Sequence, residues 1–324
     1  MEDRKLLRWG IIGCGAVTEV KSGPAYQLTK GFSLDAVMRR NAEKAEGFAK
    51  RHNVPKFYSE AESLINDPNI DAVYIATPPD THKQYGLLVA AAGKPCCIEK
   101  PLAPSYEDGL AIVEAFKRQN TPLFVAYYRR SLPRFLQVEK WLKESEIGVV
   151  RHISWNFSKP ANEIDLSGEY NWRTDAKIAP GGYFDDLASH GLDLFAYLLG
   201  NFEKVNGFST NQQGLYTAKD AITSCWIHEN GVTGQGSWNF GSLKREDRVE
   251  ILGSRGKISF PVFAEKDVVL DNNSGVKSLF IENPKHVQEF HVNNLKADLL
   301  EGVKHPSTGE TALHTAWVMD KILR

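Results

Sequence analysis

The chain has 324 residues, of which 42% are hydrophobic and 24% are charged, and its formal net charge is -1 at pH 7. This composition is typical of a globular protein, and the length suits two domains better than a single core. A charge so close to zero provides no basic surface for nucleic acid, and no apolar run approaches the ~20 residues that span a bilayer. The four cysteines lack metal-ligand spacing. We therefore expect a cytoplasmic protein that binds neither nucleic acid nor membranes.

The first predicted element is an apolar strand that ends at two closely spaced glycines, Gly13 and Gly15. A buried parallel strand has such an unbroken apolar run, and a Gly-x-Gly turn lets the backbone approach a pyrophosphate. The next helix offers its free N–H groups to that phosphate. The third glycine of the usual motif is replaced by Thr18, and an ordinary tight turn is the alternative. The predicted phosphate-binding residues are Gly13, Gly15, Ala16 and Val17.

Strand and helix patterns alternate from this turn to about residue 128. Strand-like runs occur at 32–38, 71–76, 96–98 and 123–127, and helix patterns run from 16 to about 29 and over 42–52, 59–66, 81–92 and 105–119. Strands separated by helices of about 10–15 residues indicate right-handed crossovers and a parallel, doubly wound α/β sheet. Ligands bind at the carboxyl ends of its strands. Those ends carry Gly13–Gly15, Arg39–Arg40, Thr77–Pro78, Glu99–Lys100 and Tyr128–Arg129.

The second half changes to period-two alternation. Residues 150–157 place Ile153, Trp155 and Phe157 on one face, and residues 232–240 alternate as well. Further strand candidates are 220–227, 249–252, 257–260, 268–270 and 278–281, and 287–324 returns to helix. These runs predict an open, mostly antiparallel sheet with one face covered. We therefore expect a dinucleotide-binding domain over 1–128 and an α/β substrate and oligomerisation domain over 129–324, whose C-terminal helix packs back on the first domain.

The end of the second predicted strand bears on cofactor choice. An acidic residue there usually binds the ribose 2′-OH of NAD, whereas this chain has Arg39 and Arg40, with Lys44 one turn later. Guanidinium groups bind a 2′-phosphate through charge-assisted, often bidentate bonds. The sequence therefore predicts NADP over NAD. The alternative is that the arginines lie on a solvated loop and NAD binds without an acidic clamp.

Two positions are candidates for chemistry. Lys100 follows a short apolar strand and precedes Pro101, where its ammonium group can bond a substrate oxygen beside a nicotinamide. Position alone, however, favours an exposed lysine at a strand end. Asp186 and His190 share one stripe of a predicted helix, and a carboxylate one turn from an imidazole can orient it for proton transfer. Spacing alone favours a structural Asp–His pair. A metal site would lack a second ligand cluster, so none is predicted.

Several motifs occur in a fixed order. They are Gly10 to Gly15, Ala76-Thr77-Pro78-Pro79 with His82, Gly93-Lys94-Pro95, Glu99-Lys100-Pro101, Trp172-Arg173, and Gly181-Gly182 followed by Asp186, His190 and Asp193. Together they resemble the glucose–fructose oxidoreductase, inositol dehydrogenase and MocA (Gfo/Idh/MocA) family over nearly the whole chain. The resemblance implies that Lys100, Asp186 and His190 flank the nicotinamide and the reacting carbon. We also assign Thr77, Pro78, His82 and Glu99 to the cofactor.

The resemblance further implies an N-terminal Rossmann domain and a C-terminal α/β domain whose open sheet joins copies as a homodimer or homotetramer. Tyr128 departs from the family, which often has Asn before the arginine. Tyr128, Arg129, Trp172 and Arg173 are candidate substrate-wall residues. The predicted function is an NADP-preferring oxidoreductase of a secondary alcohol or ketone on a sugar, cyclitol or small polyol. Alternatives are a redox-assisted glycoside hydrolase with tightly held cofactor and a non-catalytic NADP sensor.

Overall fold

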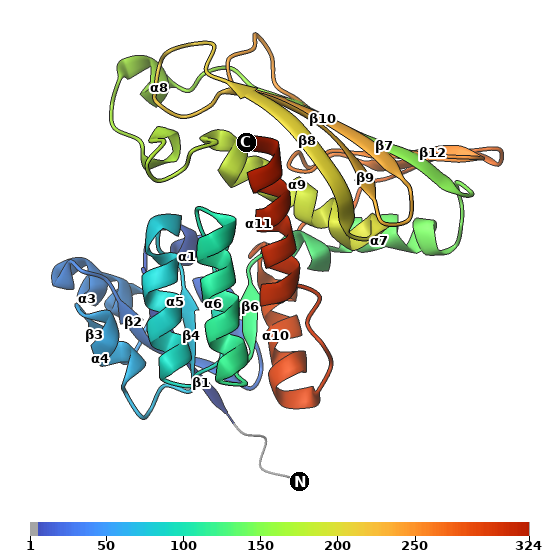
Figure 1. Ribbon diagram of the computed structural model, residues 1–324. Coiled ribbons are helices and arrows are strands. Elements are labelled where there is room, and N and C mark those ends of the chain that lie inside the picture. The colour runs from blue at the N-terminus through green and yellow to red at the C-terminus, as the bar shows by residue number, and fades with distance from the viewer. Residues whose placement is uncertain (1–5, 324) are drawn as a thin grey trace. The chain divides into compact units, whose positions relative to one another are not determined.

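The computed structural model describes residues 6–323, and the contacts among its elements divide the chain into two units (Figure 1). One unit comprises residues up to Ser131 together with Pro284–Leu313. The other comprises Leu132–Asn283 together with the residues from His314 onward. The contact boundary thus follows Ser131 rather than residue 128, and a late segment of the chain belongs with the first unit.

A six-stranded parallel sheet forms the centre of the first unit. Its strands are β1 (Leu7–Ile12), β2 (Phe32–Met38), β3 (Lys56–Tyr58), β4 (Ala72–Ile75), β5 (Cys96–Ile98) and β6 (Leu123–Val125), in the order β3-β2-β1-β4-β5-β6. All neighbouring pairs are parallel, which confirms the predicted doubly wound sheet. Strand β3 was not predicted, because its three residues show no hydrophobic alternation and the strand depends on pairing with β2.

Helices cover both faces of this sheet. They are α1 (Ala16–Val20), α2 (Gly23–Leu28), α3 (Ala42–Arg51), α4 (Ala61–Ile65), α5 (His82–Ala91), α6 (Tyr106–Arg118) and α10 (Glu289–Glu301), with the 3-10 turns η1 (Pro79–Thr81) and η2 (Tyr128–Ser131). The single helix expected from 16 to about 29 is wrong: it is broken at Lys21 and Ser22. A Cβ at Gly23 would lie 2.3 Å from the carbonyl oxygen of Thr18, so α2 packs too closely on α1 for the two to continue as one helix.

An eight-stranded sheet forms the second unit, in the order β14-β13-β12-β11-β7-β10-β9-β8. Its strands are β7 (Val150–Ser158), β8 (Phe202–Thr210), β9 (Ala221–His228), β10 (Thr233–Asn239), β11 (Glu246–Gly253), β12 (Gly256–Phe260), β13 (Val268–Asn272) and β14 (Gly275–Leu279). The β7–β10 pair is parallel and the others are antiparallel, which confirms the mostly antiparallel sheet. Strand β8 was not predicted, because Phe208 faces solvent there and breaks the expected alternation.

One face of this sheet is covered by α7 (Pro133–Lys143) and α9 (Tyr183–Leu199) (Figure 1). The unit also contains α8 (Glu163–Ser167) and η3 (Trp172–Thr174), and α11 (Gly309–Leu323) crosses the contact boundary. Phe184 of α9 packs on Trp238 of the sheet, which packs on Trp155, and all three side chains are fully buried. Gly191 allows this close packing, since a Cβ there would lie 2.3 Å from the Trp155 ring.

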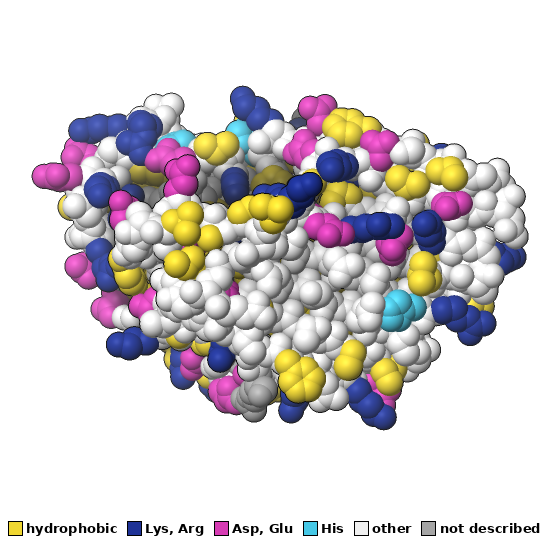
Figure 2. All heavy atoms as spheres, turned by 90° about the horizontal axis from the view of Figure 1, so that it is seen from above, with side chains coloured by type: hydrophobic (Ala, Val, Ile, Leu, Met, Phe, Trp, Pro, Cys, Tyr) yellow, Lys and Arg dark blue, Asp and Glu magenta, His cyan; other side chains and the backbone are white. Residues whose placement is uncertain are grey.

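The opposite face of the sheet is open and largely uncharged. Figure 2 shows a broad area in which neutral polar side chains and backbone dominate and charges are sparse. The outward residues of β7, β10, β9 and the edge strand β8 include Asn156, Asn206, Thr223, Gln235 and Ser237. Within residues 6–323, no helix has the length and apolarity to cross a membrane.

Candidate functional site

The turn after β1 is shaped around its glycines. Gly13 has φ +94°, and a Cβ there would lie 2.7 Å from the Thr77 side chain. Gly15 differs, because the nearest atom to a Cβ at that position is the Gly13 oxygen at 3.9 Å. The protein therefore demands glycine at 13, whereas glycine at 15 leaves room above the turn. That room adjoins Ala16 and Val17, whose N–H groups have no acceptor within the helix.

The unusual Thr18 fits the turn. Its side chain is fully buried and donates a 2.8 Å hydrogen bond to the carbonyl oxygen of Gly15. Thr18 thus closes the first turn of α1 from inside, and leaves the outer surface of the Gly13–Gly15 turn open. The residues here fit a dinucleotide pyrophosphate.

Arg39 reaches this turn from the end of β2. Its Nη1 donates to the carbonyl oxygen of Cys14 at 3.3 Å, and Arg40 beside it is exposed. Asn41 then caps α3 by accepting from the Lys44 N–H at 2.9 Å. The Arg39 guanidinium therefore lies beside the glycine turn, where an acidic residue would serve an unphosphorylated ribose, and the exposed Arg40 is the next residue along the chain.

His82 is buried, unlike Thr77 and Pro78, which are also expected to contact the cofactor. Its imidazole is fully buried and bonds the carbonyl oxygens of Thr77 at 2.8 Å and Pro101 at 3.0 Å. Burial lowers the pKa of His82, although both carbonyls act in the opposite direction. His82 thus connects the loop after β4 to the loop after β5, and it supports Thr77 and Lys100 from within the fold.

The end of β5 contains a buried hydrogen-bond network. Glu99 is 7% exposed, and its Oε1 accepts from the Tyr74 hydroxyl at 2.5 Å and from Gln288 Nε2 at 2.6 Å. Its Oε2 accepts from the backbone N–H of Lys100 at 3.2 Å. The carboxylate therefore fixes the peptide that precedes the partly exposed Lys100 side chain. Sequence reasoning missed Tyr74 and Gln288, because no local pattern marks a contact between segments so far apart.

Tyr128 and Arg129 lie in η2, directly after β6. Both are buried, and the Arg129 guanidinium lies 5.0 Å from the centre of the Tyr128 ring. The neighbouring Arg130 donates to the Pro306 carbonyl oxygen at 2.9 Å. Tyr128, Arg129 and Arg130 are therefore buried residues of the first unit.

In the second unit, α9 and η3 bring together several predicted residues. Arg173 Nε donates to Asp186 Oδ2 at 3.2 Å, and the same guanidinium lies 4.3 Å from the centre of the Trp172 ring. His190 follows Asp186 by one turn and is 4% exposed. Trp172, Arg173, Asp186 and His190 therefore form one cluster, in which a carboxylate and an imidazole share a helix face beside a cation.

The N-terminus of α9 is held by a second network that sequence reasoning missed. Tyr183 donates its hydroxyl to Asp165 at 2.8 Å and accepts from Asn162 and Asn171 at 2.6 and 3.0 Å. Loss of solvent raises the pKa of Tyr183 to about 12. Because Asn171 directly precedes Trp172, this network fixes the segment that carries Arg173 onto α9.

Two further acids on α9 have other environments. Asp193 is fully buried and accepts from the Thr315 hydroxyl at 3.1 Å, so it joins α9 to α11. Asp185 accepts from the Gly181 N–H at 2.8 Å, and desolvation raises its pKa to about 7. Among the described residues, no group of three or more His, Cys, Asp or Glu side chains is arranged to hold a metal ion.

In a comparison with known proteins, each half of the chain matches a protein-family model. Residues 7–127 match the family model described as oxidoreductase family, NAD-binding Rossmann fold. Residues 135–259 match the model described as GFO/IDH/MocA C-terminal domain.

Individual relatives agree with these matches. Oxidoreductase P35 of Formosa agariphila is 38% identical over 321 residues, which cover 99% of this chain and 98% of the relative. Levoglucosan dehydrogenase of Pseudarthrobacter phenanthrenivorans is 30% identical over 208 residues, or 64% of this chain and 50% of that protein. A solved structure of levoglucosan dehydrogenase in complex with NADH and levoglucosan superimposes with a TM-score of 0.88 at 23% identity, covering 98% of this chain and 96% of the other.

Proposed function

Since the chain belongs to the Gfo/Idh/MocA family of NAD(P)-dependent oxidoreductases, we propose that it transfers hydride to or from a small polyol. The substrate is a secondary alcohol or ketone on a sugar, cyclitol or related compound. The observation that carries the proposal is the glycine turn, in which Gly15 leaves room beside two free helix N–H groups. The similarity to levoglucosan dehydrogenase supports a sugar-like substrate.

The proposed roles follow from the chemistry of each side chain. When bound, the nicotinamide supplies or accepts the hydride. His190 takes the hydroxyl proton during oxidation and returns it during reduction, since imidazole is well matched to proton transfer near neutral pH. Asp186, held by Arg173, orients that imidazole. The Lys100 ammonium group stabilises the negative charge that develops on the substrate oxygen. Trp172 and Arg173 line the substrate side of this cluster.

We further propose a preference for NADP over NAD. The Arg39 side chain contacts the glycine turn through its hydrogen bond to the carbonyl oxygen of Cys14, and the Arg40 side chain is exposed to solvent. Two cations suit a 2′-phosphate and offer nothing comparable to a ribose hydroxyl. Arg39→Asp should weaken NADPH binding by tenfold or more while NADH binding changes little. Arg151→Asp, a charge reversal at an exposed position of β7, is the matched control.

The first experiment is a fluorescence titration of the protein with NADPH and NADH. A panel of sugars, cyclitols and keto sugars is then followed through nicotinamide absorbance. Tight NADPH binding with turnover of one polyol is the expected result. Failure to bind either nucleotide would overturn the proposed dinucleotide site at the glycine turn, and with it the proposed function. Binding without net turnover, together with release of an aglycone from a glycoside, would instead indicate a redox-assisted hydrolase.

The open face of the second unit's sheet supports a proposed homodimer or homotetramer. Phe208 of β8 is 78% exposed and lies beside the neutral side chains of Asn206, Thr223 and Gln235. Charges are sparse over a broad area of the surface shown in Figure 2. A large aromatic side chain within a neutral polar surface is typical of a protein–protein contact. Light scattering on the purified chain measures the number of subunits directly.

A further inference from the structure

The segment between β12 and β13 is organised by the carboxylate of Asp247, which lies on the neighbouring strand β11. Asp247 accepts the backbone N–H groups of Val262 at 3.0 Å, Phe263 at 2.6 Å and Ala264 at 3.3 Å. Three successive amides on one carboxylate form charge-assisted bonds that are stronger than neutral ones. These three hydrogen bonds therefore fix the backbone at Phe263.

A buried arginine holds the carbonyl groups of the same segment. Arg134 of α7 is 2% exposed and donates to the oxygens of Pro261 at 3.2 Å, Ala264 at 2.7 Å and Lys266 at 3.1 Å. One anion thus holds the N–H groups and one cation holds the C=O groups. A loop with this many fixed polar groups has little freedom to move. Residues 261–266 are a rigid support.

Within residues 261–266, the side chain of Phe263 contacts α9, the helix that carries His190. Its ring meets the His190 imidazole edge-on, with centroids 5.9 Å apart and planes at 78°. The ring also packs on Phe157 at 5.5 Å and remains partly exposed. A substrate ring held at His190 is consequently within reach of the Phe263 ring.

Asp247 places a second aromatic ring against the same turn of α9. It accepts from the indole N–H of Trp155 at 3.1 Å. Trp155 in turn packs against Gly191, the residue after His190, where no Cβ would fit. One carboxylate therefore binds both the Trp155 indole and the backbone of Phe263, and each of these residues places a ring against the His190–Gly191 turn.

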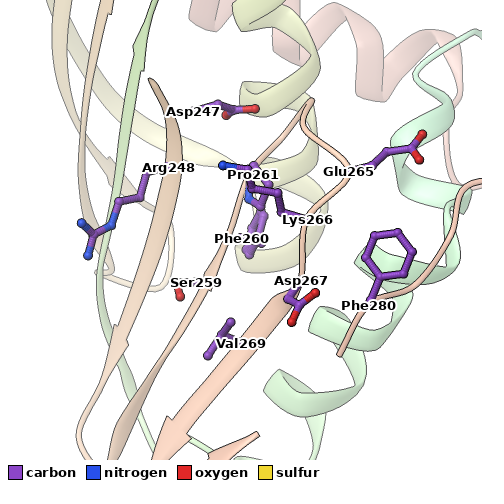
Figure 3. A pocket seen from close by; sticks show the side chains of 10 residues that line it. All are labelled: Asp247, Arg248, Ser259, Phe260, Pro261, Glu265, Lys266, Asp267, Val269 and Phe280. Atoms are coloured by element: carbon purple, nitrogen blue, oxygen red, sulfur yellow. The ribbon is translucent and has the colours of Figure 1, made fainter. Parts of the chain in front are cut away.

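Figure 3 shows the cavity next to this segment. It has a volume of about 530 Å³ and is lined by Asp247, Pro261 and Lys266 on one side and by Phe280 on another. Phe280 is 61% exposed and lines this cavity, whereas Phe263 is the ring that stands edge-on to His190. It therefore serves as a matched comparison for Phe263.

We propose that Phe263 is a specificity-determining residue and Asp247 a positioning residue for the reaction at His190. The inference rests on the proposed polyol oxidoreductase. An aromatic face beside the acid–base group takes the C–H face of a cyclic polyol, such as a pyranose or cyclitol. An open-chain polyol has no such flat apolar face and loses more conformational freedom on binding. The site therefore favours ring substrates over linear ones.

The kinetic test compares levoglucosan and myo-inositol as ring probes with sorbitol as the linear probe. Phe263→Leu should lower the ring-to-linear ratio of kcat/KM by about tenfold, mainly through KM. Phe280→Leu should leave the ratio unchanged. An enzyme that turns over ring substrates with an unaltered ratio in Phe263→Leu would overturn the specificity role.

A second readout does not depend on turnover. In protein with ¹³C-labelled histidine, the Cε1–H signal of His190 is assigned by its loss in His190→Gln and followed against pH. Phe263→Leu and Asp247→Asn should both shift the signal and its titration, and Phe280→Leu should not. A wild-type signal in Asp247→Asn would remove Asp247 from the positioning role. If no polyol is turned over, the proposed function and the specificity role fail together, while this signal still decides whether Asp247 positions Phe263.

Discussion

The two units hold their proposed catalytic groups by different means. In the second unit, Asp186 and His190 lie one turn apart on α9, so helix geometry alone makes them neighbours. In the first unit, Lys100 depends on Glu99, which depends on Tyr74 from β4 and on Gln288 from the segment that begins α10. Local spacing can be recognised in a sequence, whereas a network assembled from three distant segments cannot.

The largest effect is expected from replacing Lys100, whose position depends on residues from distant segments of the chain. Lys100→Met retains the length of the side chain and removes its charge, so kcat should fall by about 10²–10³-fold, because charge developing on the substrate oxygen loses its partner. The dissociation constant for NADPH should change far less. Lys117→Met, at an exposed position of α6, is the control. Equal losses in kcat and cofactor affinity would indicate a purely structural lysine.

Perturbation of the Glu99 network should have an intermediate effect. Gln288→Leu and Tyr74→Phe each remove one donor from Glu99 Oε1, and each should lower kcat by about tenfold with unchanged NADPH affinity, since a lost hydrogen bond to a charged group costs about 1.5–3 kcal/mol. The double variant should lose less than the product of the two, because both act through one carboxylate. Gln119→Leu, exposed at the end of α6, should be neutral. Fully multiplicative losses would contradict a shared route through Glu99.

Asp185 lies outside the proposed chemistry, so its replacement should have the smallest effect on turnover, and its expected effect is on stability. Its pKa rises from 3.8 to about 7 on folding, so between these values the folded state binds more protons and stability falls as pH increases. Asp185→Asn removes this loss. The variant should gain stability over wild type as pH rises from 4 to 7, by up to about 1.4 kcal/mol for each pH unit, with no further gain above that.

Denaturant unfolding at several pH values measures this difference, with Glu229→Gln at an exposed position as the control. A constant difference across the pH range would show that Asp185 ionises normally in the folded protein.

Much of the fold could be predicted, and the reasons are local. The apolar runs of β1 and β4 and the helix patterns between them indicated a parallel sheet, which the strand pairing confirms. The alternation in β7 and β10 likewise indicated a sheet covered on one side. The misses at β3 and β8 are strands whose existence depends on neighbours rather than on their own residues.

The sequence by itself determined which residues could carry chemistry: the glycine turn, Arg39 and Arg40, Lys100, and the Asp186–His190 pair. Each of these is a short-range pattern, set by backbone freedom or by helix periodicity. Only the tertiary structure showed what holds them, such as His82 between two loops, Gln288 on Glu99, and Asp247 beneath Phe263. These contacts join segments far apart in the chain, and burial gives their hydrogen bonds the strength that a linear pattern does not reveal.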